Sequence, residues 1–85
     1  MKFTVTYKPS AEQELADLWV NAISRQAVAD AANRVDTLLK SDPFAQGESR
    51  DGKSRILFER PLAVQFEIHE EDRLVEVLKV SWVGK

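Results

Sequence analysis

The spacing of apolar side chains along the chain changes twice, from every second residue to helical spacing and back. Residues 1–8 alternate between apolar and polar side chains, which is typical of a strand with one buried face. Residues 10–40 carry apolar side chains three and four positions apart, as on one face of a helix. The alternation returns in residues 54–83. The pattern therefore predicts an α+β domain in which helices separate the first strand from the others.

Two helices are predicted in the helical region, with a break at residues 21–24. Ser10 and Gln13 have the spacing of a capping box and predict the start of the first helix. Ser24 is a favoured N-cap residue and predicts the start of the second, which ends near Lys40. Because the connection is short, we expect the helices to form an antiparallel hairpin.

Three strand-like runs follow a loop. Residues 41–53 contain Pro43 and two glycines and have no apolar period, so we expect them to form the loop. Alternation over residues 54–59, 62–69 and 73–83, with short turns between them, predicts an antiparallel meander. With the strand at the N-terminus, the sheet should have four main strands.

The last strand contains a conflict of phase. Val75 and Val77 define one alternation, whereas Leu78 and Val80 define the opposite one. Either both faces of this strand are covered, or a β-bulge at Val77 and Leu78 resets the phase. We favour the bulge, because a single alternation would place Lys79 on the face that packs against the helices.

A single core is predicted within one domain that comprises residues 1–85. A chain of this size buries only about 60–65% of the surface that its unfolded form exposes, so nearly every apolar residue is needed. We expect the centre of the core to be formed by seven side chains on the apolar stripes: Leu15, Leu18, Trp19, Val35, Leu38, Val64 and Phe66.

Composition and charge narrow the functional classes. The formal net charge of −2 argues against a general basic surface for nucleic acids. The absence of cysteine excludes disulfides and thiolate sites. No apolar run approaches the ~18 residues of a membrane span, and the start lacks the apolar segment of a signal peptide. We therefore expect a cytoplasmic protein without a membrane partner.

Positive charge gathers around the predicted strand at residues 54–59. Arg50, Lys53, Arg55 and Arg60, which we refer to as the basic cluster, are candidates for binding a target or a partner protein through phosphate or acidic groups. Acidic residues are interleaved with them, so the alternative is that they form ion pairs on the surface.

The remaining candidate chemistry is sparse. His69 is the single histidine, stands beside three acidic residues and could titrate near neutral pH. No histidine and carboxylate spacing recurs, and the acidic turn at residues 70–72 lacks the other ligands of a calcium loop, so we expect no metal site. Motifs for a serine nucleophile or a phosphate-binding glycine loop are absent from the sequence, and we expect no cofactor.

The element order, the length, the arginine-bearing second strand and the short Arg60–Pro61 turn together resemble the RelE/ParE superfamily, toxins of bacterial type II toxin–antitoxin modules. The similarity extends over the whole chain and is closest in EQELADLW, RQAVADAANRVDTLL, DPFAQGESRDGKSRILFERPLAVQFEI and RLVEVLKVSW. The resemblance implies the order β-α-α-β-β-β, with a four-stranded, mainly antiparallel sheet. It also implies that the first strand lies beside the last and that both helices pack on one sheet face.

The resemblance further implies a plasmid-stabilising toxin that inhibits growth and forms a hetero-oligomer with a cognate antitoxin. Relatives that cleave mRNA on the ribosome need a general base, a proton donor and cations around the reacting phosphate. Arg55, His69 and Lys79 are the candidates here, whereas Ala63 stands near an expected arginine and the given sequence ends without the expected tyrosine. This comparison favours ParE-like binding of DNA gyrase. A RelE-like mRNA endoribonuclease and a non-toxic interaction domain are the alternatives.

Overall fold

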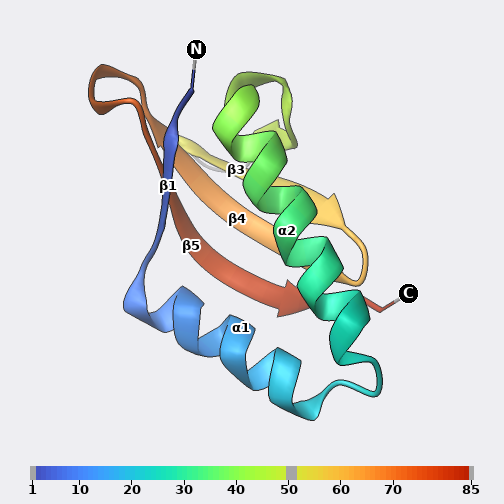
Figure 1. Cartoon of the computed structure of the whole chain (residues 1–85). Helices are drawn as coiled ribbons and strands as arrows, with labels where there is room; N and C mark the ends of the chain where they lie inside the picture. The colour runs from blue at the N-terminus through green and yellow to red at the C-terminus, as the bar shows by residue number, and fades with distance from the viewer. Residues whose placement is uncertain (1, 50–51, 85) are drawn as a thin grey trace.

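The computed structural model describes residues 2–49 and 52–84, and in these it forms one five-stranded sheet and two α-helices (Figure 1). The elements are β1 (Thr4–Tyr7), α1 (Pro9–Asn21), α2 (Arg25–Ser41), the 3-10 turn η1 (Pro43–Ala45), β2 (Glu48–Ser49), β3 (Ser54–Glu59), β4 (Leu62–His69), the 3-10 turn η2 (Glu70–Asp72) and β5 (Leu74–Trp82). The strand order is β1-β5-β4-β3-β2, and β1 is parallel to β5 while the other pairs are antiparallel. The predicted α+β fold is confirmed, and the first strand lies beside the last. Neither described helix has the length and apolar character needed to cross a membrane.

The described chain has one strand more than the four predicted. Glu48 and Ser49 pair with Ile56 and Arg55 in a segment that we expected to be loop only. Gly47 allows the chain to pass this close to β3. Its φ of +69° favours glycine, and a Cβ added to it would lie 2.3 Å from the carbonyl oxygen of Ile56. A two-residue strand is too short to leave an alternation in the sequence, which explains why the prediction missed it.

The two helices begin in different ways. The Ser24 hydroxyl accepts a hydrogen bond of 3.2 Å from the amide of Ala27, which confirms the predicted N-cap of α2. Helix α1 begins at Pro9, and within the described chain no side chain caps its N-terminus, so the predicted capping box of Ser10 and Gln13 is wrong. Proline is favoured at the first helical position because its φ is already helical and its missing N–H is not needed there.

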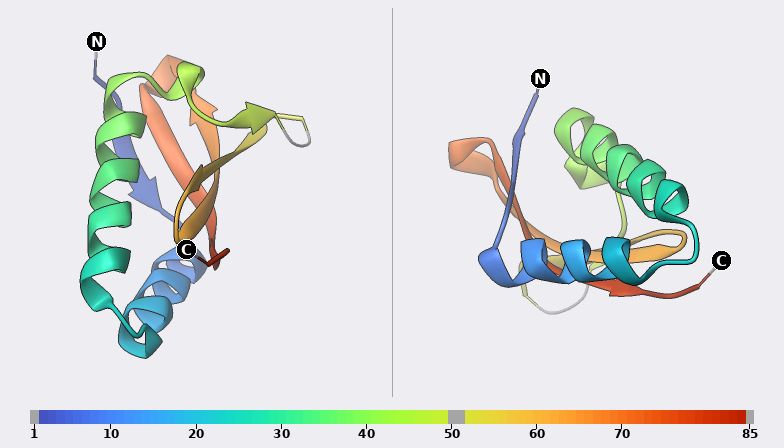
Figure 2. Two further views of the ribbon diagram at one scale, coloured as in Figure 1. Left: turned by 90° about the vertical axis from the view of Figure 1, so that its right-hand side faces the viewer. Right: turned by 60° about the horizontal axis from the view of Figure 1, so that its bottom comes forward.

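The β-bulge predicted in β5 is present where it was expected. Gln65 lies opposite Lys79 and its neighbour Phe66 lies opposite Val77, so Leu78 is the extra residue. The bulge lets apolar residues on both sides of it face the helices, although their alternation is out of phase. It also keeps Lys79 on the other sheet face, which we refer to as the open face because no helix covers it (Figure 2).

The core lies between the two helices and the sheet face that they cover, which is opposite to the open face (Figure 2). Its most fully buried large side chains are those of Val28, Val35, Leu39, Leu62, Val64, Phe66, Val75 and Val77. Among the seven residues predicted at the centre, Val35, Val64 and Phe66 are buried there, and the three leucines are partly buried against them. The predicted core is therefore correct at Val35, Val64 and Phe66, whereas the fully buried leucine of α2 is Leu39 and not Leu38.

Trp19 is the predicted core residue that the structure contradicts. Its side chain is 42% exposed, and the guanidinium of Arg25 lies 4.9 Å from the centre of its ring. Helix α1 packs mainly along β5, beyond the end of β1, and Ala11 is the fully buried residue of this helix within the described chain (Figure 1). The apolar stripe of α1 is therefore wider than the face that the sheet covers.

Glu14 joins α1 to the edge of β5 that β1 leaves uncovered. Strand β1 pairs with β5 only as far as Val77. Beyond that point the Glu14 carboxylate accepts a hydrogen bond of 2.9 Å from the amide of Val80, and it lies 3.6 Å from Nζ of Lys79. A side chain thus replaces the carbonyl that a neighbouring strand would supply.

We expect Glu14→Ala to lower the free energy of unfolding by about 1–3 kcal/mol, because the amide of the buried Val80 loses its acceptor. Asp17→Ala removes the same charge from an exposed position of the same helix and should change stability by less than about 0.5 kcal/mol. Urea unfolding monitored by circular dichroism measures both values. Equal effects of the two substitutions would contradict the capping role.

Candidate functional site

A pocket lies at the end of the sheet where β3 begins and β4 ends. Its volume is about 520 Å³. It is lined by Phe44, Ser49, Gly52, Lys53, Ser54, Arg55, Ile68, His69, Glu70, Glu71 and Asp72. The fold therefore brings two members of the basic cluster together with the single histidine and the acidic turn η2.

The other two members of the basic cluster are Arg50 and Arg60. Arg50 lies outside the described residues. Arg60 lies at the opposite end of β3, in the turn to β4, where its backbone carbonyl accepts a hydrogen bond of 3.1 Å from the guanidinium of Arg34. Among the described residues, only Lys53 and Arg55 therefore combine positive charge with a place in the pocket.

The guanidinium of Arg55 is directed at backbone carbonyls. Its Nε donates to the carbonyl of Gln46 at 3.0 Å, and its Nη2 donates to the carbonyls of Gly47 at 3.2 Å and Phe44 at 3.4 Å. Arg55 lies opposite Phe66, so its side chain starts from the helix-covered face of the sheet. Its charge holds the segment from η1 to β2 against β3.

Lys53 and Lys79 are in different environments. Lys53 is exposed at the start of β3. Lys79 lies on the open face opposite Gln65, and its ammonium group pairs with the carboxylate of Glu14. Of these two cations, Lys53 is the one placed to meet a partner at the pocket.

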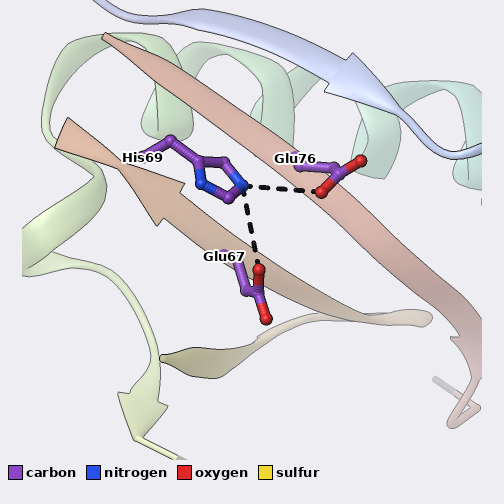
Figure 3. A group of neighbouring side chains, drawn as sticks. All are labelled: Glu67, His69 and Glu76. Carbon is purple, nitrogen blue, oxygen red and sulfur yellow. Dashed lines mark ion pairs between the residues drawn. The ribbon is translucent and has the colours of Figure 1, made fainter. Parts of the chain in front are cut away.

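His69 lies between two carboxylates on the open face (Figure 3). Its Nε2 is 3.7 Å from Oε1 of Glu67 and 3.5 Å from Oε1 of Glu76. Glu67 on β4 and Glu76 on β5 are direct cross-strand partners, an arrangement in which like charges repel. We refer to these three residues as the Glu–His–Glu group. The pattern of the sequence does not single out the two glutamates, because their pairing depends on the register of the sheet.

Tyr7 does not contribute to the open face. It lies opposite Val77 and packs against the core. Burial raises the pKa of the Tyr7 hydroxyl, and the nearby charge of Asp36 raises it further, so the hydroxyl stays protonated at neutral pH. Tyr7 shares this placement with Phe3 and Val5, the other apolar residues of the alternation in residues 1–8.

No protein-family model and no curated protein sequence matches this chain. Solved structures do match it over nearly its whole length. A chain of the toxin–antitoxin complex RelBE2 from Mycobacterium tuberculosis matches this structure with a TM-score of 0.78 and 15% identity. The match covers 96% of this chain and 99% of the other.

Two further structures agree with this match. The chromosomal ParDE toxin–antitoxin system from P. aeruginosa gives a TM-score of 0.75 at 21% identity, with 96% of this chain and 97% of that chain covered. The isolated E. coli RelE toxin gives 0.69 at 13% identity, with 98% of this chain and 86% of that chain covered. At these identities the structures share the fold with this chain.

Proposed function

We propose that this chain, whose fold is that of the RelE/ParE toxins, is the toxin of a type II toxin–antitoxin module and acts by binding its target. The fold supports the toxin role through its similarity to RelBE2, ParDE and RelE. The contacts that the candidate catalytic side chains make favour binding of a target over catalysis. Arg55 is held by loop carbonyls, Lys79 pairs with Glu14, and His69 is flanked by two carboxylates.

The negative charge around His69 is the main observation that favours binding of a target over catalysis. RNA cleavage by the 2′-hydroxyl places negative charge on the reacting phosphate, and cations must stabilise that charge. A phosphate that approached His69 on the open face would meet Glu67 and Glu76, and at the pocket it would meet the acidic turn η2. Neighbouring carboxylates oppose such an approach, because binding of nucleic acid depends on the neutralisation of phosphates by cations. We therefore propose a protein target, with DNA gyrase as the ParE-like candidate.

Growth assays with separate biochemical readouts test this function. Induced expression in a bacterium should arrest growth, and co-expression of the cognate antitoxin should restore it. The purified chain should inhibit supercoiling by DNA gyrase and should produce no mRNA fragments on ribosomes. A chain that leaves growth unchanged would favour a non-toxic interaction domain.

The RelE-like alternative rests on the presence of His69 and Lys53 in one pocket, because a base or acid next to a cation suits cleavage of RNA. Ribosome-dependent mRNA cleavage that is lost in both His69→Asn and Lys53→Ala, with unchanged unfolding curves, would establish this alternative. It would overturn the gyrase proposal.

An exposed apolar surface supports a protein partner. Ile23 is fully exposed and Trp82 is 49% exposed, and both line one groove with Leu18, Asn21 and Ala22. Apolar side chains that gather on a surface mark protein interaction sites. We propose that this apolar patch binds the antitoxin, whose C-terminal segment is disordered when free and wraps the toxin on binding.

Calorimetry of the toxin with the antitoxin tests this contact. Folding of the antitoxin segment on apolar surface should give a large negative change in heat capacity. Ile23→Ser should weaken binding about tenfold, as expected for a side chain at the centre of an interface. Phe58→Ser, an equally apolar change at an exposed position of β3, is the matched control and should bind like the wild type. A heat-capacity change near zero, or no binding, would contradict the proposal.

A further inference from the structure

We propose that Glu67, His69 and Glu76 form a binding site for a divalent transition cation, with Zn²⁺ as the best-fitting ion. Each residue offers one ligand atom, and the three atoms lie within 4.8 Å of one another. They project from the adjacent strands β4 and β5 toward a common point on the open face (Figure 3). The site does not depend on the proposed toxin function.

The distances suit a tetrahedral ion. In a zinc site with bonds of about 2.0–2.1 Å, the ligand atoms lie about 3.3–3.4 Å apart. Nε2 of His69 is 3.5 Å from Oε1 of Glu76 and 3.7 Å from Oε1 of Glu67, so these two pairs need to close by only a few tenths of an ångström. Rotation of the two glutamate side chains, each about one third exposed, can close the remaining pair. The backbone need not move, because the sheet ladder already holds the three residues in register.

The charges also suit a divalent cation. Glu67 and Glu76 are direct cross-strand partners, and like charges in this position destabilise a sheet. Among the described residues, no lysine or arginine lies within ion-pair distance of either carboxylate. A protonated His69 supplies one positive charge to two negative groups, whereas Zn²⁺ with a neutral His69 balances both. Binding of Zn²⁺ therefore removes the repulsion between the carboxylates of Glu67 and Glu76.

The donor set favours zinc over the alkaline-earth ions. Imidazole is a good ligand for Zn²⁺ and similar transition ions, whereas Ca²⁺ takes six to eight oxygen ligands and Mg²⁺ prefers oxygen. Three protein ligands leave one tetrahedral position, and on the open face water can occupy it. The chain has no cysteine and no second histidine, so its side chains offer zinc no other site with imidazole or thiolate ligands.

This composition makes the test unambiguous. Tag-free protein at pH 7.5 is titrated with zinc chloride by calorimetry, and the ring protons of His69 are followed by NMR. Because there is one histidine, its ring signals need no assignment by mutation. We expect saturation at one equivalent of zinc together with a shift or broadening of the His69 signals. Magnesium chloride at the same concentration should leave them unchanged.

Substitutions separate a coordinated ion from general attraction to acidic groups. His69→Asn, Glu67→Gln and Glu76→Gln should each weaken zinc binding at least about tenfold, since even outer-shell partners of metal ligands have effects of this size. Glu71→Gln is the matched control, because it removes the same charge from the adjacent turn η2 without touching the Glu–His–Glu group. It should bind zinc within about twofold of the wild type. Circular dichroism confirms that each variant is folded.

Three outcomes would overturn the proposal. The first is the absence of any change in the His69 signals at millimolar zinc. The second is equal weakening by Glu71→Gln and Glu67→Gln, which would show diffuse attraction to the acidic surface. The third is equal binding of magnesium, which would show that the imidazole is not a ligand.

Discussion

Phe66→Ala should leave the protein largely unfolded at room temperature. The Phe66 side chain is fully buried in the core, on the strand that lies between β3 and β5. Truncation of a buried phenylalanine to alanine costs about 3–5 kcal/mol, because both apolar burial and close packing are lost. The whole stability of a small domain is about 5–15 kcal/mol, and an 85-residue chain is expected near the lower limit.

Phe58→Ala is the matched control for this prediction. Phe58 lies on β3, is 56% exposed and loses the same atoms on truncation, so its cost should stay below about 1 kcal/mol. Thermal unfolding monitored by circular dichroism compares the two variants with the wild type. A cooperative transition of Phe66→Ala close to that of the wild type would show that the core does not depend on this ring.

Arg55→Ala should lower the free energy of unfolding by about 2 kcal/mol. Three backbone carbonyls, those of Phe44, Gln46 and Gly47, lose a charged donor together. Hydrogen bonds to charged groups contribute about 1.5–3 kcal/mol each, but this site is partly exposed and water can replace part of the loss. Arg55→Lys should restore little, because an ammonium group cannot reproduce the planar fork of the guanidinium.

Lys53→Ala is the control, since Lys53 is exposed and should change stability by no more than about 0.5 kcal/mol. Denaturant unfolding of the three variants measures the difference. The stabilities of Arg55→Ala and Lys53→Ala also show which variant is suitable for testing whether the basic cluster binds a partner. A loss of function in Arg55→Ala includes a loss of structure, whereas Lys53→Ala reports on binding alone. Equal stability of Arg55→Ala and Lys53→Ala would contradict a structural role of Arg55.

Local patterns were sufficient to predict most of the architecture. The strict alternation in β4 specified which side chains face the helices, and the conflict between Val75 and Leu78 located the bulge. Ser24 marked the start of α2 through a hydrogen bond that spans only three residues. These features depend on neighbours in the sequence, so their signals lie in short stretches of the chain.

Other features depended on where elements pack. Trp19 lies on the apolar stripe of α1, but the position of that helix along β5 leaves the ring half exposed. Strand β2 exists because Gly47 brings the chain close to Ile56, which a pattern of apolar residues does not record. Glu14 caps an amide 66 positions away, and no local rule connects two such residues.

The candidate site shows the same division. Patterns in the sequence were enough to predict the elements, their order, the apolar faces of the strands and the charged residues. Only the folded arrangement of the elements shows that Arg55 binds carbonyls, that Lys53 and His69 line one pocket, and that Glu67 and Glu76 flank that histidine. Alternation is a property of one strand, whereas the distance between charges on two strands depends on their register. That register is set by the packing of the whole sheet against the helices.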